Sequence, residues 1–78
     1  MTENEVTEKL SKIFDEIFID SEFSFSRNLS ANDIDEWDSL THINLIVAIE
    51  KEFGISFTLD ELEAQNSVGD TIDMIINK

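Results

Sequence analysis

The 78-residue chain contains no proline and only two glycines, Gly54 and Gly69. Tight hairpin turns depend on glycine at positions of positive φ, and proline commonly marks turns and loops. The chain therefore lacks the turn residues that would separate several short strands. These absences favour long helices joined by polar segments, and the length is that of one small domain, residues 1–78.

Apolar residues recur at helical spacing in several segments. This spacing predicts a first helix from about Glu3 to Phe18 and a second from Ser39 to Phe53. A short helical run is expected from Leu59 to Ala64, and a last helix from Val68 to Asn77. The fold class is therefore all-α, a small bundle of three main helices plus one short helix.

Residues that favour helix ends stand at most of these boundaries. The expected caps are Thr2 with Glu5, Asp38, Gly54, Thr58 with Glu61, and Ser67. Between the first two helices, residues 19–37 form a long and mostly polar connection, with a short turn expected from Ala31 to Asp35 after Ser30. Connections of this length are uncommon in compact domains and are often functional.

The second predicted helix is apolar on more than one face. At 100° per residue, Leu45, Ile46, Ile49 and Phe53 share one arc, and His42 lies beside them. A second arc holds three further apolar residues, namely Leu40, Ile43 and Val47. A surface helix of a small domain needs only one apolar face, so either another helix covers the second arc or it contacts a partner.

Charge limits the partners of this chain. Eighteen acidic residues and five basic ones give a formal net charge of −13. Nucleic acids and anionic membranes would be repelled, whereas basic patches on partner proteins would be attracted. Alternatively, the acids only maintain solubility. There is no cysteine, no evident signal peptide and no membrane-length apolar run, so we expect a cytoplasmic monomer.

Asp38, Ser39 and His42 are the residue types of a hydrolytic triad. Ser39 and His42 are neighbours on one helix face, but the hydroxyl would lie at an exposed helix start. A triad also needs an oxyanion hole and exclusion of water, and neither is evident in so small a bundle. We therefore interpret His42 as a residue at the boundary of the core and do not expect an enzyme.

The acids at Asp33, Asp35 and Asp38 invite comparison with a calcium-binding loop. Such a loop requires ligands at its first, third and fifth positions, glycine at the sixth and glutamate at the twelfth. Counted from Asp33, the fifth position is Trp37 and the twelfth is Asn44. The pattern fails, and no metal site is expected.

A serine that is itself modified fits this position better. A phosphodiester at the start of a helix lies near the positive end of the helix dipole. The arc of Leu40, Ile43 and Val47 begins beside Ser39 and would form an adjacent docking strip. The alternative is an unmodified acidic interaction module that docks through the same three residues, with Ser39 merely starting the helix.

Asp38-Ser39-Leu40 opens a helix after a long loop in an acidic chain of this length, and here the sequence resembles the acyl carrier protein family. The order of helices and the segment from Ile49 to Ile55 are also similar to that family. The resemblance implies 4′-phosphopantetheine on Ser39, attached by a phosphopantetheinyl transferase whose metal and substrate Asp38 would help to position. It also implies docking by Leu40, Ile43 and Val47 to acyl ligases or synthases with basic patches.

Several residues depart from the pattern usual in carriers of fatty acid synthesis. Glu36 stands where glycine is usual, and Thr41, Asn44 and Lys51 make the second helix less acidic. These departures leave open fatty acid, polyketide or related biosynthesis. Trp37 is expected either to fill the core under the long connection or to lie beside the arm.

Overall fold

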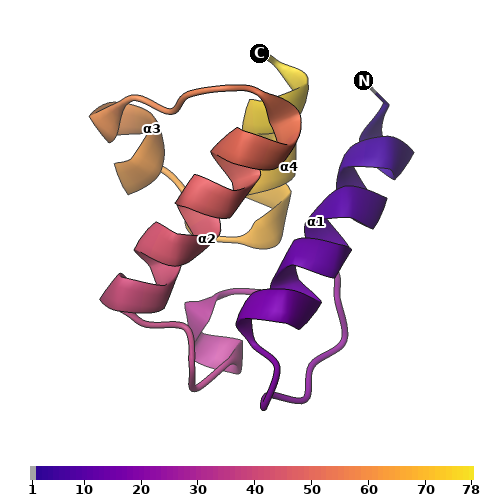
Figure 1. Ribbon diagram of the computed structural model, residues 1–78, viewed down its shortest axis with the longest axis vertical. Helices are drawn as coiled ribbons and strands as arrows, with labels where there is room; N and C mark the ends of the chain where they lie inside the picture. Colours follow the sequence, from indigo (N-terminus) through magenta and orange to yellow (C-terminus); the bar gives the residue numbers. More distant parts are fainter. Residues whose placement is uncertain (1) are drawn as a thin grey trace.

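A computed structural model describes residues 2–78. The elements in chain order are α1 (Glu3–Ile17), a 3₁₀ turn (Ala31–Asp33), α2 (Ser39–Phe53), α3 (Leu59–Glu63) and α4 (Val68–Ile76). No strand occurs among residues 2–78, and the predicted all-α bundle of three main helices plus one short helix is confirmed. α1 and α2 lie side by side and run in opposite directions, as Figure 1 shows.

The helices begin and end close to the expected residues. Thr58 and Glu61 form the predicted capping box, and the Ser67 hydroxyl accepts a hydrogen bond from a backbone N–H in the first turn of α4. Gly54 ends α2 with a φ of 64°, where glycine avoids the steric cost of a side chain. The Thr2 hydroxyl caps α1 by accepting from the Glu5 N–H.

The helix ends differ from the sequence prediction by one residue in α1, α3 and α4. In α1, Phe18 has left the helix, with φ −106° and ψ 53°, although its N–H still bonds to the Phe14 carbonyl. The turn after Ser30 is also shorter than expected and ends at Asp33. Terminal residues fray in this way because the last turn lacks a full set of hydrogen-bond partners.

The core lies where α1, α2, α4 and the long connection meet. α1, α2 and α4 supply most of its side chains, α3 buries none, and α1 packs against both α2 and α4. The buried apolar residues are Val6, Leu10, Ile13, Phe14, Phe18, Leu29, Ile34, Leu45, Ile46, Ile49, Val68, Ile72 and Ile75. Burial of these side chains is the main favourable contribution to folding.

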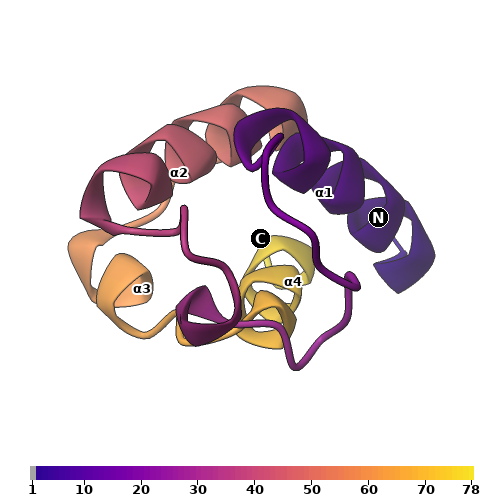
Figure 2. The ribbon, with the colours of Figure 1, turned by 90° about the horizontal axis from the view of Figure 1, so that it is seen from below.

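The long connection crosses the end of the bundle opposite the two chain termini, as Figures 1 and 2 show. Leu29 and Ile34 bury their side chains in the core, so the connection is held by hydrophobic packing. The Leu29 carbonyl accepts the Val68 N–H at 2.8 Å, which joins the connection to the start of α4. This packing fixes the path of the chain into α2.

Arg27 joins the same connection to both ends of the sequence. Its guanidinium contacts Glu3 at 2.6 Å and Asp73 at 2.9 Å. The Arg27 carbonyl accepts the Gly69 N–H at 2.9 Å, so backbone and side chain both hold this point of the loop. The ion pairs are exposed, and we assign them a small share of the stability.

Candidate functional site

Reciprocal hydrogen bonds hold the turn that leads into α2. Asp38 Oδ1 accepts the N–H groups of Leu40 and Thr41, each at 3.0 Å. Thr41 Oγ1 accepts the Asp38 N–H at 2.8 Å and donates to the Glu36 carbonyl at 2.7 Å. The hydrogen bond from the Thr41 N–H has the largest effect on the pKa of the Asp38 carboxyl, and it lowers that pKa. Asp38 is therefore a charged cap that fixes Ser39 as the first residue of α2.

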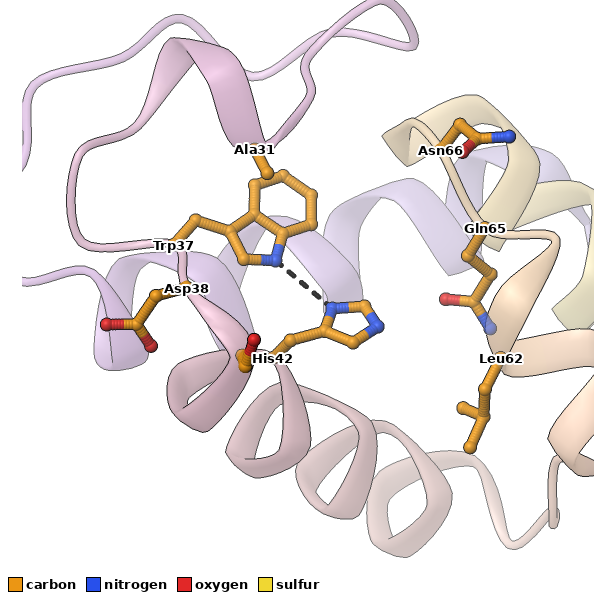
Figure 3. A pocket seen from close by; sticks show the side chains of 8 residues that line it. Ala31, Trp37, Asp38, His42, Leu62, Gln65 and Asn66 are labelled. Carbon is orange, nitrogen blue, oxygen red and sulfur yellow. Dashed lines mark hydrogen bonds between the residues drawn. The ribbon is translucent and has the colours of Figure 1, made fainter.

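Ser39 is exposed, as the sequence predicts, and it borders a cleft of about 420 Å³. The cleft lies between the start of α2, the 3₁₀ turn and the link from α3 to α4, shown closely in Figure 3. Its lining residues are Ala31, Trp37, Asp38, Ser39, His42, Leu62, Gln65 and Asn66. In Figure 3 the Asp38 carboxylate points away from His42, although Asp38 is one of the residues that line the cleft.

Trp37 packs on the core, which is one of the two positions that the sequence left open, and it also lines the cleft that Ser39 borders. Its ring centroid lies 5.3 Å from that of Phe14 and 5.7 Å from that of Phe18, so it packs on the core. Its indole Nε1–H donates to His42 Nδ1 at 3.1 Å, and the two rings stack at 6.2 Å within the cleft. Trp37 therefore covers the aromatic core on one side and forms a wall beside Ser39 on the other.

His42 is a half-buried residue at the boundary of the core, as expected. Burial lowers its pKa below the ordinary value, so the neutral ring is favoured at neutral pH. Since Nδ1 accepts the indole proton of Trp37, the proton of the neutral ring resides on Nε2. In a hydrolytic triad Nε2 is unprotonated and accepts the serine proton, whereas Nδ1–H donates to a carboxylate; in His42 the Trp37 bond to Nδ1 places the proton on Nε2 instead.

The second apolar arc of α2 is uncovered in this chain. Leu40, Ile43 and Val47 are 70%, 59% and 55% exposed, whereas the opposite face buries Leu45 and Ile49. The sequence left open whether another helix covers this strip. Among residues 2–78, no helix does. Exposed apolar rows of this kind are typical of contact surfaces.

No cluster of three His, Cys, Asp or Glu side chains that could hold a metal ion lies within residues 2–78. None of the helices in this range has the length and apolar character needed to cross a bilayer.

Sequence reasoning missed two residues that shape the site. Thr41 completes the capping box of α2, although threonine is not the usual residue at its position. Gln65 lies on the far wall of the cleft, and its Oε1 accepts from the Thr71 hydroxyl at 3.0 Å. Its Nε2 is buried and has no hydrogen-bond partner among the described residues. No pattern marks Gln65 in the sequence, because only folding brings it opposite His42.

Comparisons with known proteins agree with this architecture. Residues 36–75 match the family described as "Phosphopantetheine attachment site". The acyl carrier protein of Thermosynechococcus vestitus is 36% identical over all of this chain and 96% of its own length. The acyl carrier protein of Buchnera aphidicola subsp. Schizaphis graminum is 37% identical over 96% of this chain and 95% of its own.

A solved structure extends the comparison to three dimensions. The solution structure of a holo acyl carrier protein from Geobacter metallireducens superposes with a TM-score of 0.85 at 44% identity. The match covers 94% of this chain and 84% of that one. Fold and site therefore define a phosphopantetheine-attachment carrier. The chain belongs to the acyl carrier protein family.

The prosthetic group of this family is 4′-phosphopantetheine, and the structure offers a place that fits it. The start of α2 is exposed, as a phosphodiester requires, and an open cleft lies directly beside it. Gln65 lines the same cleft opposite His42.

Proposed function

We propose that Ser39 carries the 4′-phosphopantetheine and that the chain presents an acyl or aminoacyl group to partner enzymes. The observation that carries this proposal is the exposed Ser39 hydroxyl, at the start of α2 and beside the cleft, within the segment 36–75 that matches the attachment-site family. When bound, the arm supplies a terminal thiol that holds the acyl group as a thioester.

The attachment is a phosphoryl transfer onto Ser39. The Ser39 oxygen loses its proton and bonds to the phosphorus of the phosphopantetheine of coenzyme A, and the adenosine bisphosphate portion leaves. The N–H groups of Leu40 and Thr41 already bond to Asp38 Oδ1, so the helix dipole stabilises the charge of the new phosphodiester. The chain supplies the acceptor and its environment, and the transferase supplies catalysis.

Asp38 is proposed to assist the phosphopantetheinyl transferase. Its carboxyl pKa is lowered by the N–H groups it accepts, so it is ionised at neutral pH and keeps free lone pairs. In Figure 3 the carboxylate points outward, which suits contact with a metal held by the transferase. The same carboxylate also caps the helix, so its removal would affect attachment and helix stability together.

Leu40, Ile43 and Val47 are proposed to contact partner enzymes. Together they form an exposed apolar strip that begins beside Ser39, so a partner seated on it would meet the arm at its origin. A net charge of −13 would steer partners with basic patches toward the chain. The partners implied are the transferase and acyl ligases or synthases of fatty acid, polyketide or related biosynthesis.

The chain itself is proposed to be a carrier without catalysis. A tethered thioester reaches successive enzymes at a high effective concentration, which requires no catalytic group on the carrier. The family's prosthetic group favours this function over the unmodified interaction module. A cytoplasmic, monomeric chain that binds neither nucleic acid nor membrane stays a prediction from composition.

Loading in vitro tests the proposal. The chain is incubated with coenzyme A and a broad-specificity phosphopantetheinyl transferase, and its intact mass is measured. Wild type and a Ser56→Ala control should each gain one phosphopantetheine, whereas Ser39→Ala should gain none. Circular dichroism should show that Ser39→Ala is folded, because Asp38 still caps α2. Loading of Ser39→Ala would contradict the proposal, and unchanged partner binding without any loading would favour the interaction module.

The docking strip is tested by exchanging one exposed apolar residue for a polar one. Ile43→Asn should raise the KM of the transferase for the chain severalfold. Ile19 is 76% exposed and lies outside α2, so Ile19→Asn is a matched control that should leave KM unchanged. An equal effect of both changes would show that the strip on α2 is not the contact.

A further inference from the structure

The exposed side of α2 carries no carboxylate over about three turns, residues 39–49. Within this stretch the only ionisable residue is His42, which is half-buried and mainly neutral at neutral pH. Glu50, the next acid along the helix, accepts the Phe57 N–H at 2.8 Å with its side-chain oxygen. The acids that give the net charge of −13 therefore lie elsewhere on the chain, and a basic patch laid along α2 would meet no carboxylate there.

Two further exposed residues lie on the same side of α2 as the apolar strip. At about 100° per residue, Asn44 and Lys51 fall within about 40° of Leu40 around the helix. Both side chains are exposed. The outer side of α2 therefore presents apolar side chains around one neutral amide and ends in one positive charge.

Lys51 has no charged partner among the described residues. No charge stands three or four positions from it, at Val47, Ala48, Gly54 or Ile55, so no neighbour on the helix can pair with it. The ion pairs formed within residues 2–78 involve other basic residues. The last turn of α2 favours a positive charge through the helix dipole, but this leaves the ammonium group free to bond to another molecule.

Resting on the proposed attachment at Ser39, we propose that the phosphopantetheinyl transferase docks on this side of α2 through an apolar surface that places an acidic side chain opposite Lys51. The transferase must reach the hydroxyl of the first residue of α2, so it covers the first turns of the helix. Lys51 lies twelve residues further on, about 18 Å along the axis. One side of a standard protein interface, about 800 Å², is about 30 Å across, so a single surface spans both residues.

Long-range attraction and direct contact then involve different parts of the transferase. The net charge of −13 attracts basic groups from a distance. The acids closest to Ser39 in the sequence precede it, at Asp35, Glu36 and Asp38, so these basic groups meet the chain before α2 begins. The transferase surface is therefore basic where it faces the long connection, and apolar with an acidic group where it faces α2.

The sign of this contact is tested by the KM of a broad-specificity phosphopantetheinyl transferase for variants of the chain. Asn44→Glu and Lys51→Gln each make the net charge more negative by one unit. Asn28→Glu does the same in the long connection, between two residues whose carbonyls bond to the start of α4, and is the matched control. A basic patch on α2 would give a lower KM with Asn44→Glu and would not be weakened by Lys51→Gln.

We expect the reverse for both variants of α2. Lys51→Gln should raise KM about two- to fivefold, the effect of losing one partly exposed ion pair. Asn44→Glu should raise KM further, because a carboxylate is then buried against an apolar surface without a partner. Lys51→Arg keeps the charge and should give a KM near that of wild type, and Asn28→Glu should leave KM unchanged.

The outcomes separate this contact from the attachment itself. Circular dichroism should show that each variant is folded, and intact mass should show that each gains phosphopantetheine at high transferase concentration. A wild-type chain that does not load at any concentration counts against the proposed function at Ser39, whereas changes in KM alone concern the docking surface. Both rises in KM are required: an unchanged or lower KM in Asn44→Glu or Lys51→Gln would overturn the proposal. An equal rise in Asn28→Glu would also overturn it, because net charge would then be the cause.

Discussion

Phe14 of α1 packs against aromatic residues of the long connection. Its replacement by leucine should lower the stability of the domain and loosen the connection. Phe14 is 1% exposed, and its ring centroid lies 5.4 Å from Phe18, 6.2 Å from Phe23, 5.2 Å from Phe25 and 5.3 Å from Trp37. An aromatic pair contributes about 0.5–1.5 kcal/mol beyond burial. Because the four pairs share one ring, they do not add fully.

Leucine keeps much of the apolar volume but none of the edge-to-face contacts. We therefore expect Phe14→Leu to lower the free energy of unfolding by about 2–3 kcal/mol. For a domain of this size, 1 kcal/mol corresponds to a Tm change of roughly 4–8 °C, so Tm should fall by about 8–24 °C. Differential scanning calorimetry measures the change, and faster amide exchange in residues 19–37 should accompany it.

Phe57→Leu is the matched control. Phe57 is half-buried, and its ring faces Lys78 Nζ at 5.5 Å without joining the aromatic cluster around Phe14. Its replacement should cost about 1 kcal/mol or less. Equal losses of Tm in the two variants would refute the assignment of Phe14 as the centre of the cluster.

Three further predictions concern pH, backbone packing and salt. Burial lowers the pKa of His42, so its contribution to stability is present above the ordinary pKa near 6.5 and is lost as pH falls through the lowered value. Between pH 7.5 and 5.5, wild type should therefore lose more Tm than His42→Gln, and Trp37 fluorescence should change in wild type alone; parallel curves would contradict this. Gly69→Ala should lower Tm, although alanine usually favours helices, because its Cβ would lie 3.1 Å from the Arg27 carbonyl oxygen; a higher Tm would show that the loop yields. Added salt should raise Tm, because it screens the repulsion among the acidic residues that give the net charge of −13. A fall in Tm would show that salt weakens stabilising ion pairs more than it relieves this repulsion.

The helices could be predicted from the sequence because their determinants are local. Helical spacing and cap residues depend on neighbours within four positions, so Asp38 and Gly54 mark the ends of α2 before any packing is known. The same geometry places Leu40, Ile43 and Val47 on one arc, but only the folded structure shows that this arc is exposed. These features agree between sequence and structure because local preference and tertiary packing favour the same conformation.

The cleft could not be predicted in this way. Trp37, His42 and Gln65 come from the long connection, α2 and the link before α4, and their meeting depends on tertiary packing. The sequence also could not show that the Trp37 ring packs on the core and lines the cleft at the same time. The unpaired nitrogen of Gln65 is likewise visible only when the partner of its Oε1 is known.

The most direct test of the central claim is to locate the modification on the loaded chain. After incubation with coenzyme A and the transferase, the chain is digested and its peptides are fragmented by tandem mass spectrometry. We predict that phosphopantetheine resides on Ser39 alone, in the peptide that contains Trp37 and Asp38. Phosphopantetheine on any other serine, with Ser39 unmodified, would contradict the account of this site.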